Sequence, residues 1–288
     1  MEKVLLGKTG YKIAPVVFGG IINTDESQED ANRYVASAIE RGVNYFDVAP
    51  TYGNAEERLG AALEPFRKDV YLACKTARRD AAGAKEDLLE SMRRLRTDYF
   101  DVYQLHSIQL DSDVNAVFSK GGAMETLEWA KKEGIARKLG ITAHSEEQAL
   151  HCLDLYDFNS VLFTMYWVPA VLRGVGDKLA EAAKARNIGL LCMKVLAHRA
   201  WREGEIKPDD DRRWYKRAEL GSPLALAAMK FCLSKGDALV PPGQYDAFCY
   251  MLDHIDEVIA NPLSHNDLEF LKEEAEKIKE DELKLIGI

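Results

Sequence analysis

The chain has 288 residues, of which 47% are hydrophobic and 30% charged, so it can bury a large core and is not disordered. Its 38 Lys and Arg against 47 Asp and Glu give a formal net charge of -9, which argues against nucleic acid as the main partner. No apolar stretch is long enough for a membrane span, residues 1–20 lack a signal-peptide pattern, and the scattered cysteines favour neither disulfides nor a metal site. We therefore expect a cytoplasmic protein with one domain over residues 1–288, no membrane partner and no metal.

Short apolar runs alternate along the chain with amphipathic stretches. The runs lie at residues 15–20, 43–48, 70–75, 99–105, 136–142, 160–164, 188–193 and 238–240. Their length and their β-branched and aromatic residues predict strands. Between them, apolar residues three and four positions apart predict helices, most clearly over residues 31–39, 88–95 and 268–278. Eight strand–helix units of this kind predict an α/β fold, a (β/α)8 TIM barrel with a C-terminal helix.

Two further segments refine this prediction. Residues 4–13 contain a Gly-bearing turn between apolar ends, which predicts an N-terminal β-hairpin that plugs the lower end of the barrel. The first strand is followed by Phe18-Gly19-Gly20-Ile21 without a G-x-G-x-x-G pattern, which disfavours the alternative of a doubly wound dinucleotide-binding sheet. Residues 198–220 form a long, charge-rich connection at the active end of the barrel, either a lid or a fixed arm.

Four polar residues come at or just after the carboxyl ends of predicted strands, where barrel enzymes place their active sites. They are Asp47, Tyr52, Lys75 and His106. Each by itself has an ordinary structural explanation, as a turn cap, a core aromatic, a solvated strand end or a turn histidine. All four at one end of one barrel favour a catalytic site.

This set suits proton transfer to a carbonyl oxygen. A phenol has a pKa near 10 and needs a neighbouring cation to act as an acid near neutral pH. Lys75 would supply that charge to Tyr52, and Asp47 would hold the lysine charged. His106 would then orient the substrate oxygen.

Several segments resemble the signatures of the aldo-keto reductase family over nearly the whole chain. These are Leu6–Gly10, Asn44–Gly53, Glu56–Gly60, Cys74–Thr76 and Asp101–Ser107. The resemblance implies an NAD(P)H-dependent aldo-keto reductase, of the carbonyl reductase or alcohol dehydrogenase type, with Asp47, Tyr52, Lys75 and His106 as its catalytic residues. It also implies a nicotinamide cofactor that supplies the hydride while the protein supplies the proton.

The cofactor half of the resemblance is weaker than the catalytic half. Where the family usually has Ser-Asn, Gln and an aromatic residue, this chain has Thr142-Ala143, Phe163 and Met193. We expect the cofactor contacts at Gly19, Gly20, Thr142, Met193, Gly243, Gln244 and Tyr245. We expect the substrate pocket at Ile21, Asn23, Trp167 and Trp201, with Trp214 as a further candidate.

The choice between NADH and NADPH depends on basic residues that the chain lacks after its eighth predicted strand. No Lys or Arg occurs from Gly236 to Leu271, where the family usually binds the 2′-phosphate of NADPH. Unless arginines of the 198–220 connection supply that charge, the sequence predicts no strong preference for NADPH over NADH.

Two other functions stay open at this point. One is a nicotinamide-nucleotide-sensing barrel with little turnover, which the weak cofactor motifs favour and the complete set of four residues disfavours. The other is an aldolase-type enzyme with Lys75 as a Schiff-base amine. The sequence names neither the physiological carbonyl substrate nor the oligomeric state.

Overall fold

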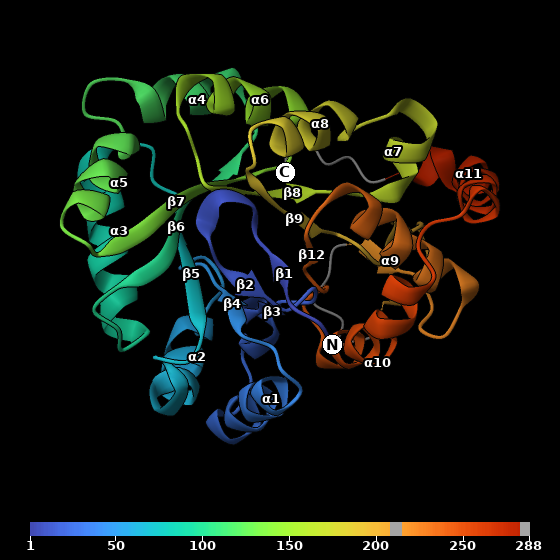
Figure 1. The fold of residues 1–288 in the computed structure, drawn as a ribbon, viewed down its shortest axis with the longest axis horizontal. Helices are drawn as coiled ribbons and strands as arrows, with labels where there is room; N and C mark the ends of the chain where they lie inside the picture. Colours follow the sequence, from blue (N-terminus) through green and yellow to red (C-terminus); the bar gives the residue numbers. More distant parts are fainter. Residues whose placement is uncertain (208–214, 283–288) are drawn as a thin grey trace.

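The computed structural model of the chain describes residues 1–207 and 215–282. Its centre is a curled sheet of eight parallel strands, each hydrogen-bonded to the next in chain order (Figure 1). The strands are β3 (Phe18–Gly19), β4 (Tyr45–Asp47), β5 (Tyr71–Thr76), β6 (Phe100–Ile108), β7 (Ala136–Ala143), β8 (Ser160–Thr164), β9 (Gly189–Met193) and β12 (Ala238–Leu239). The eight predicted strands are therefore confirmed.

The sheet closes on itself between its first and last strands. The Val17 amide donates to the Leu239 carbonyl at 3.0 Å, and the Leu239 amide donates to the Pro15 carbonyl at 2.8 Å. With its edges paired, the sheet is a (β/α)8 barrel, as the spacing of the apolar runs predicts.

Helices surround the barrel (Figure 1). They are α1 (Gln28–Glu40), α2 (Ala55–Leu63), α3 (Ala81–Arg94), α4 (Asp111–Phe118), α5 (Ala123–Lys132), α6 (Glu146–Leu155), α7 (Trp167–Arg173), α8 (Asp177–Ala185), α9 (Pro223–Lys235), α10 (Tyr245–Ala260) and α11 (His265–Ile278). The apolar faces predicted for α1, α3 and α11 are buried, that of α11 against the neighbouring helices α7 and α9. In the part of the chain that the structure describes, no helix has the length and apolar character needed to cross a membrane.

The predicted N-terminal hairpin consists of β1 (Val4–Leu5) and β2 (Lys12–Ile13), which pair antiparallel. Leu6 and Ile13 are fully buried in the cluster of apolar side chains inside the barrel. The Lys8 amide donates to the carbonyl of Asn187, just before β9. The hairpin therefore covers the amino end of the barrel, opposite the end at which the strands point their carboxyl termini.

The long connection after β9 is a second antiparallel hairpin, β10 (Ala197–Ala200) paired with β11 (Tyr215–Arg217). Trp214 and the arginines at 212 and 213 lie outside the described residues. One boundary differs from the prediction, because His106 lies within β6, which continues to Ile108 and not only to residue 105.

Candidate active site

Asp47 and Lys75 form a buried ion pair at the carboxyl ends of β4 and β5. Lys75 has no exposed surface, and its Nζ donates to a carboxylate oxygen of Asp47 and, at 2.9 Å, to the carbonyl of Val48. The Gln104 amide donates to the other Asp47 oxygen at 2.8 Å. Each polar atom of the pair thus has a partner, which a buried charge requires.

Tyr52 and His106 complete the cluster. The Lys75 Nζ lies 5.4 Å from the centre of the Tyr52 ring. The Tyr52 and His106 rings meet edge to face, with centroids 5.9 Å apart. The structure thus brings together all four residues predicted to be catalytic.

A β-bulge directs His106 toward this cluster. The pairing of β6 with β7 shifts register between Leu105 and Ile108, and Ser107 has a left-handed φ of 55°. The Ser107 amide donates to the Thr142 hydroxyl at 2.7 Å. Arg79 donates to the carbonyl of His106 at 2.8 Å and to that of Ser107 at 2.9 Å. These bonds hold the irregular backbone in one conformation, as bulges beside active sites commonly require.

The environment sets the protonation of the cluster. Burial raises the pKa of Tyr52 above 10.0, and the Lys75 charge opposes that rise. Burial, together with the Lys75 charge, lowers the pKa of His106 well below 6.5, so its imidazole is neutral at pH 7. Its buried Nδ1 has no hydrogen-bond partner within residues 1–207 and 215–282. A neutral imidazole beside a phenol is suited to hold a carbonyl oxygen without competing for its proton.

Lys75 itself stays protonated. Burial alone would lower its pKa, but the Asp47 carboxylate together with Tyr52 and Cys74 outweighs burial, and the pKa is raised above 10.5. An ammonium group has no lone pair for attack on a carbonyl, which disfavours the Schiff-base alternative.

Three cavities at this end of the barrel share lining residues. The first, of about 260 Å³, is lined by Tyr52, Lys75 and His106. The second, of about 290 Å³, shares Met193 and Lys194 with it. The second also shares Gly243 with the largest cavity, of about 1210 Å³. Together the three cavities extend from the four clustered residues to the β10–β11 hairpin, and we refer to them as the path.

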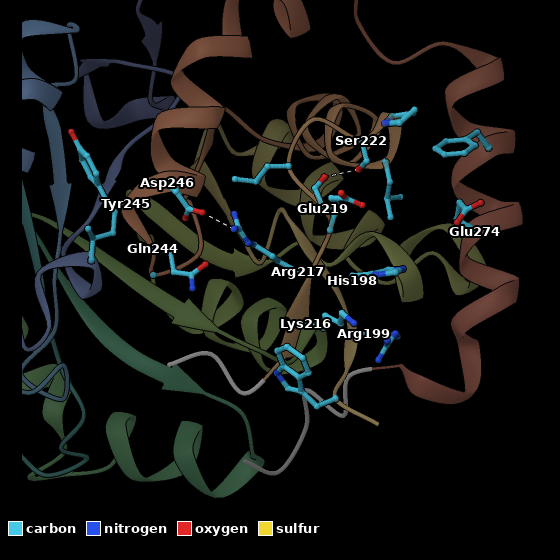
Figure 2. A pocket seen from close by; sticks show the side chains of 18 of the residues that line it. His198, Arg199, Lys216, Arg217, Glu219, Ser222, Gln244, Tyr245, Asp246 and Glu274 are labelled. Carbon is cyan, nitrogen blue, oxygen red and sulfur yellow. Dashed lines mark hydrogen bonds and ion pairs between the residues drawn. The ribbon is translucent and has the colours of Figure 1, made fainter. Parts of the chain in front are cut away.

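The largest cavity lies between that hairpin and the start of α10 (Figure 2). Among the residues that the structure describes, four polar atoms of residues lining it are buried without a hydrogen-bond partner: Arg217 Nη1, His198 Nε2, Trp201 Nε1 and Gln244 Oε1. Arg217 also pairs with Asp246 of α10 at 2.6 Å, as the dashed line in Figure 2 shows. Buried polar groups are rarely left unpaired, so these atoms mark this part of the structure as a candidate for binding a polar ligand.

The residues expected to bind the cofactor are distributed along this path. Thr142 and Met193 line the first cavity, Gly19 the second, and Gln244 and Tyr245 the largest. Gly20 is buried away from these cavities. A Cβ there would come within 2.8 Å of the Val48 side chain, so packing explains this glycine.

The residues expected around the substrate are more dispersed. Ile21 lines the first two cavities, whereas Trp201 lines the largest one, near the hairpin. Trp167 is fully buried and donates to the Ala197 carbonyl at 2.8 Å, and Asn23 is fully buried. Neither Trp167 nor Asn23 lines the three cavities.

Sequence reasoning missed three residues at the site. Gln104 contacts Asp47, Arg79 holds the His106 backbone, and Lys194 lines two of the cavities. Gln104 had a detectable signal, because it points to the same face of its strand as His106. Nothing in the local sequence distinguishes Arg79 from a surface arginine.

Known proteins give independent information. The sequence profile of the aldo/keto reductase family matches residues 15–258. L-Galactose dehydrogenase from Arabidopsis thaliana is 28% identical over 82% of this chain and 76% of that protein. A probable voltage-gated potassium channel subunit beta from the same plant is 28% identical over 81% of this chain and 84% of that protein.

Solved structures agree on the fold. An aldo-keto reductase from Bacillus halodurans, in its holo form, superposes with a TM-score of 0.72 over 95% of this chain and 96% of that chain, at 21% identity. By its sequence match and its barrel, the chain belongs to the aldo/keto reductase family, whose members are NAD(P)-dependent oxidoreductases.

Proposed function

We propose that the chain reduces an aldehyde or ketone with NAD(P)H and that Tyr52 is the proton donor. The observation that carries this proposal is that Tyr52 lies beside two groups with different roles. The Lys75 ammonium supplies a positive charge, and the neutral His106 imidazole supplies a hydrogen-bond donor. When bound, the nicotinamide cofactor supplies the hydride.

Residues of the chain orient the carbonyl oxygen, donate the proton and stabilise the resulting charge. His106 donates a hydrogen bond that orients the carbonyl oxygen beside the Tyr52 hydroxyl. Tyr52 then gives its proton to that oxygen as negative charge develops there. The Lys75 ammonium stabilises the tyrosinate that is left, and Asp47 keeps Lys75 charged and in place.

The path of three cavities fits a dinucleotide. Its nicotinamide end belongs in the first cavity, between Thr142 and Met193, where it faces Tyr52. Its adenosine end belongs in the largest cavity, where Arg217, His198 and Gln244 have unpartnered polar atoms. The fit rests on those atoms and on the volume of the cavity.

We retain the expectation of no strong preference for NADPH. Arg199 and Lys216 of the hairpin both pair with Glu205, and Arg217 pairs with Asp246. Each of these three cations that line the adenosine cavity thus already has a carboxylate partner, which Arg199 and Lys216 share. Dissociation constants for NADPH and NADH within tenfold of each other would support this expectation, and tighter NADPH binding by tenfold or more would contradict it.

The decisive variant is Tyr52→Phe. Loss of the proton donor should reduce aldehyde turnover by about a hundredfold to ten-thousandfold, the usual size of a general-acid contribution. Nucleotide affinity, measured by quenching of tryptophan fluorescence, should change little. Near-normal turnover by Tyr52→Phe would remove this residue from the mechanism.

A second candidate is a nucleotide-sensing barrel with little turnover, which the similarity to the probable channel subunit favours. Oxidation of bound NAD(P)H by a reactive aldehyde separates the two functions. Multiple turnovers support the reductase, whereas tight nucleotide binding with a single slow turnover supports the sensor.

A further inference from the structure

Gln104 contacts the buried ion pair from inside the barrel. It lies on β6 two residues after Val102, which belongs to the apolar cluster inside the barrel, so both side chains point to the interior face. In the sheet it stands opposite Lys75 of β5 and Gly140 of β7. Gln104 has no exposed surface, and its amide nitrogen donates to Asp47 Oδ1 at 2.8 Å. A fully buried amide thus meets the carboxylate that pairs with the lysine.

The two oxygens of the Asp47 carboxylate have separate partners. Oδ2 accepts from the Lys75 ammonium, and Oδ1 accepts from the Gln104 amide. A carboxylate held at one oxygen can turn about its terminal bond, because that torsion has broad minima. The bond from Gln104 occupies the second oxygen and so fixes the orientation of the carboxylate. Lys75, which also donates to the Val48 carbonyl, is thereby kept 5.4 Å from the centre of the Tyr52 ring.

The barrel accommodates this amide at an energetic cost. Gln104 Oε1 is buried and has no hydrogen-bond partner among the described residues, which is destabilising for an acceptor. A Cβ on Gly140 would lie 3.2 Å from Gln104 Cγ and 2.6 Å from Ser160 Oγ, so a glycine leaves the room that these side chains need. An apolar side chain of similar size would fill the space without an unpaired oxygen. Packing alone therefore gives no reason for an amide here, whereas the bond to Asp47 does.

We propose that Gln104 is a positioning residue, which holds the Asp47 carboxylate in the orientation that keeps the Lys75 ammonium beside Tyr52. Gln104 lines none of the three cavities of the path, so it acts through the ion pair and not on a ligand. The proposal rests on the proposed function of Tyr52 as the proton donor.

Loss of the Gln104 amide changes the electrostatic environment of Tyr52. Burial and the Asp47 charge raise the pKa of Tyr52, whereas the Lys75 charge lowers it. An N–H group that donates to the carboxylate offsets part of its negative charge. Without that donor, the Asp47 charge acts more strongly on the phenol, and a carboxylate that can turn draws the ammonium away from it. Both effects raise the pKa of Tyr52.

The test variant is Gln104→Met, which keeps a long, unbranched side chain but removes the donor. In steady-state alcohol oxidation, the limb of the pH–rate profile that reports Tyr52 should move to higher pH by about half a unit to one unit. Below the limb, this shift corresponds to a loss of about threefold to tenfold in kcat, because less tyrosinate is present at a given pH. KM for the alcohol and the affinity for the nucleotide should not change, since Gln104 lines none of the cavities.

Gln148 provides a matched control. It is also a buried glutamine whose Oε1 lacks a partner in the described part of the chain, but it lies on α6, one of the helices outside the barrel (Figure 1). Gln148→Met should leave the limb and kcat at their parent values. Thermal unfolding of both variants verifies that each is folded under the conditions of the assay.

An unmoved limb in folded Gln104→Met would overturn the proposal, and so would an equal shift in Gln148→Met. A raised KM with an unchanged kcat would mean that Gln104 acts on substrate binding, which also overturns it. If Gln104→Met does not fold, Gln104→Asn answers the same question, because its amide is one methylene too short to reach Asp47 Oδ1. The limb of Gln104→Asn should also move to higher pH, and a limb at the parent position would overturn the proposal.

Failure of the proposed function is a separate result. If Tyr52→Phe keeps near-normal turnover, Tyr52 is not the proton donor and the proposed function fails. If Tyr52→Phe loses turnover but the limb of Gln104→Met stays in place, only the role of Gln104 fails.

Discussion

The Asp47–Lys75 pair acts on Tyr52 through charge across a short distance. Burial raises the pKa of the phenol, and the Lys75 ammonium is the neighbour that opposes this rise. The lysine therefore does not make Tyr52 a strong acid in the free protein but limits the effect of burial.

Removal of this charge leads to a prediction about pH. In Lys75→Met the pKa of Tyr52 should rise further, so the tyrosinate needed for alcohol oxidation forms only at higher pH. The limb of the pH–rate profile that reports Tyr52 should therefore move to higher pH. Steady-state alcohol oxidation between pH 6 and 11 measures it.

Two controls accompany that profile. Lys235→Met removes a lysine that pairs with Asp177 at 2.7 Å, away from the barrel mouth, and should leave the limb unmoved. Thermal unfolding is also needed, since an unpaired Asp47 costs about 3 to 5 kcal/mol of stability. A folded Lys75→Met that loses activity without any shift of the limb would show that Lys75 has another task.

At the scale of single elements, the β10–β11 hairpin brings to the largest of the three cavities the cations that α10 lacks. Each of them meets a carboxylate, and Arg217 meets Asp246, whose side chain is 57% exposed. An exposed ion pair is worth little in stability, about 0 to 1 kcal/mol. The pair is important because Asp246 offsets the positive charge that Arg217 presents to a ligand.

This pairing predicts a change of cofactor preference. In Asp246→Asn, Arg217 loses its carboxylate partner and a negative charge beside the cavity disappears. The affinity for NADPH should then rise about fivefold to tenfold relative to NADH, since one charge-assisted contact is gained by the 2′-phosphate. Fluorescence titration with both nucleotides measures the ratio.

The double variant Asp246→Asn with Arg217→Gln is the control for this experiment. It should return the ratio of the two affinities to that of the parent protein. An unchanged ratio in Asp246→Asn alone would mean that Arg217 does not reach the 2′-phosphate.

At the scale of the whole molecule, the N-terminal hairpin seals one end of the barrel while the other end stays open for chemistry. Gly7 is the contact point, with a left-handed φ of 42°. A Cβ on Gly7 would lie 2.3 Å from the backbone nitrogen of Gly189 at the start of β9. Only glycine permits this approach of hairpin and barrel.

Gly7→Ala should therefore destabilise the whole fold. Gly10 supplies a matched control, because it also has a positive φ, of 79°, but a Cβ there meets nothing within 4 Å. Gly10→Ala should cost about 1 to 2 kcal/mol for backbone strain alone. Gly7→Ala should lower the free energy of unfolding, measured with urea, clearly more than Gly10→Ala does. Equal losses would mean that the hairpin can move away from Gly189 without a loss of stability.

Much of the barrel was predictable because its determinants are local. Each of the eight strands has an apolar run of its own, and residues such as Asp47 and Lys75 come at the carboxyl ends of those runs. In a parallel barrel all these ends meet on one side, so the position along the chain was enough to predict the cluster of four catalytic candidates.

What only the tertiary structure decided depends on contacts between distant segments. His106 lies inside β6 and is turned by a bulge that Arg79 and Thr142 hold, and neither partner is near it in sequence. The pairing of Arg217 with Asp246 and the place of Lys194 between two cavities likewise depend on how a hairpin folds back over the barrel. Local periodicity reports which face of an element is buried, but it carries no information on which remote side chain meets it, because that is decided when the elements pack.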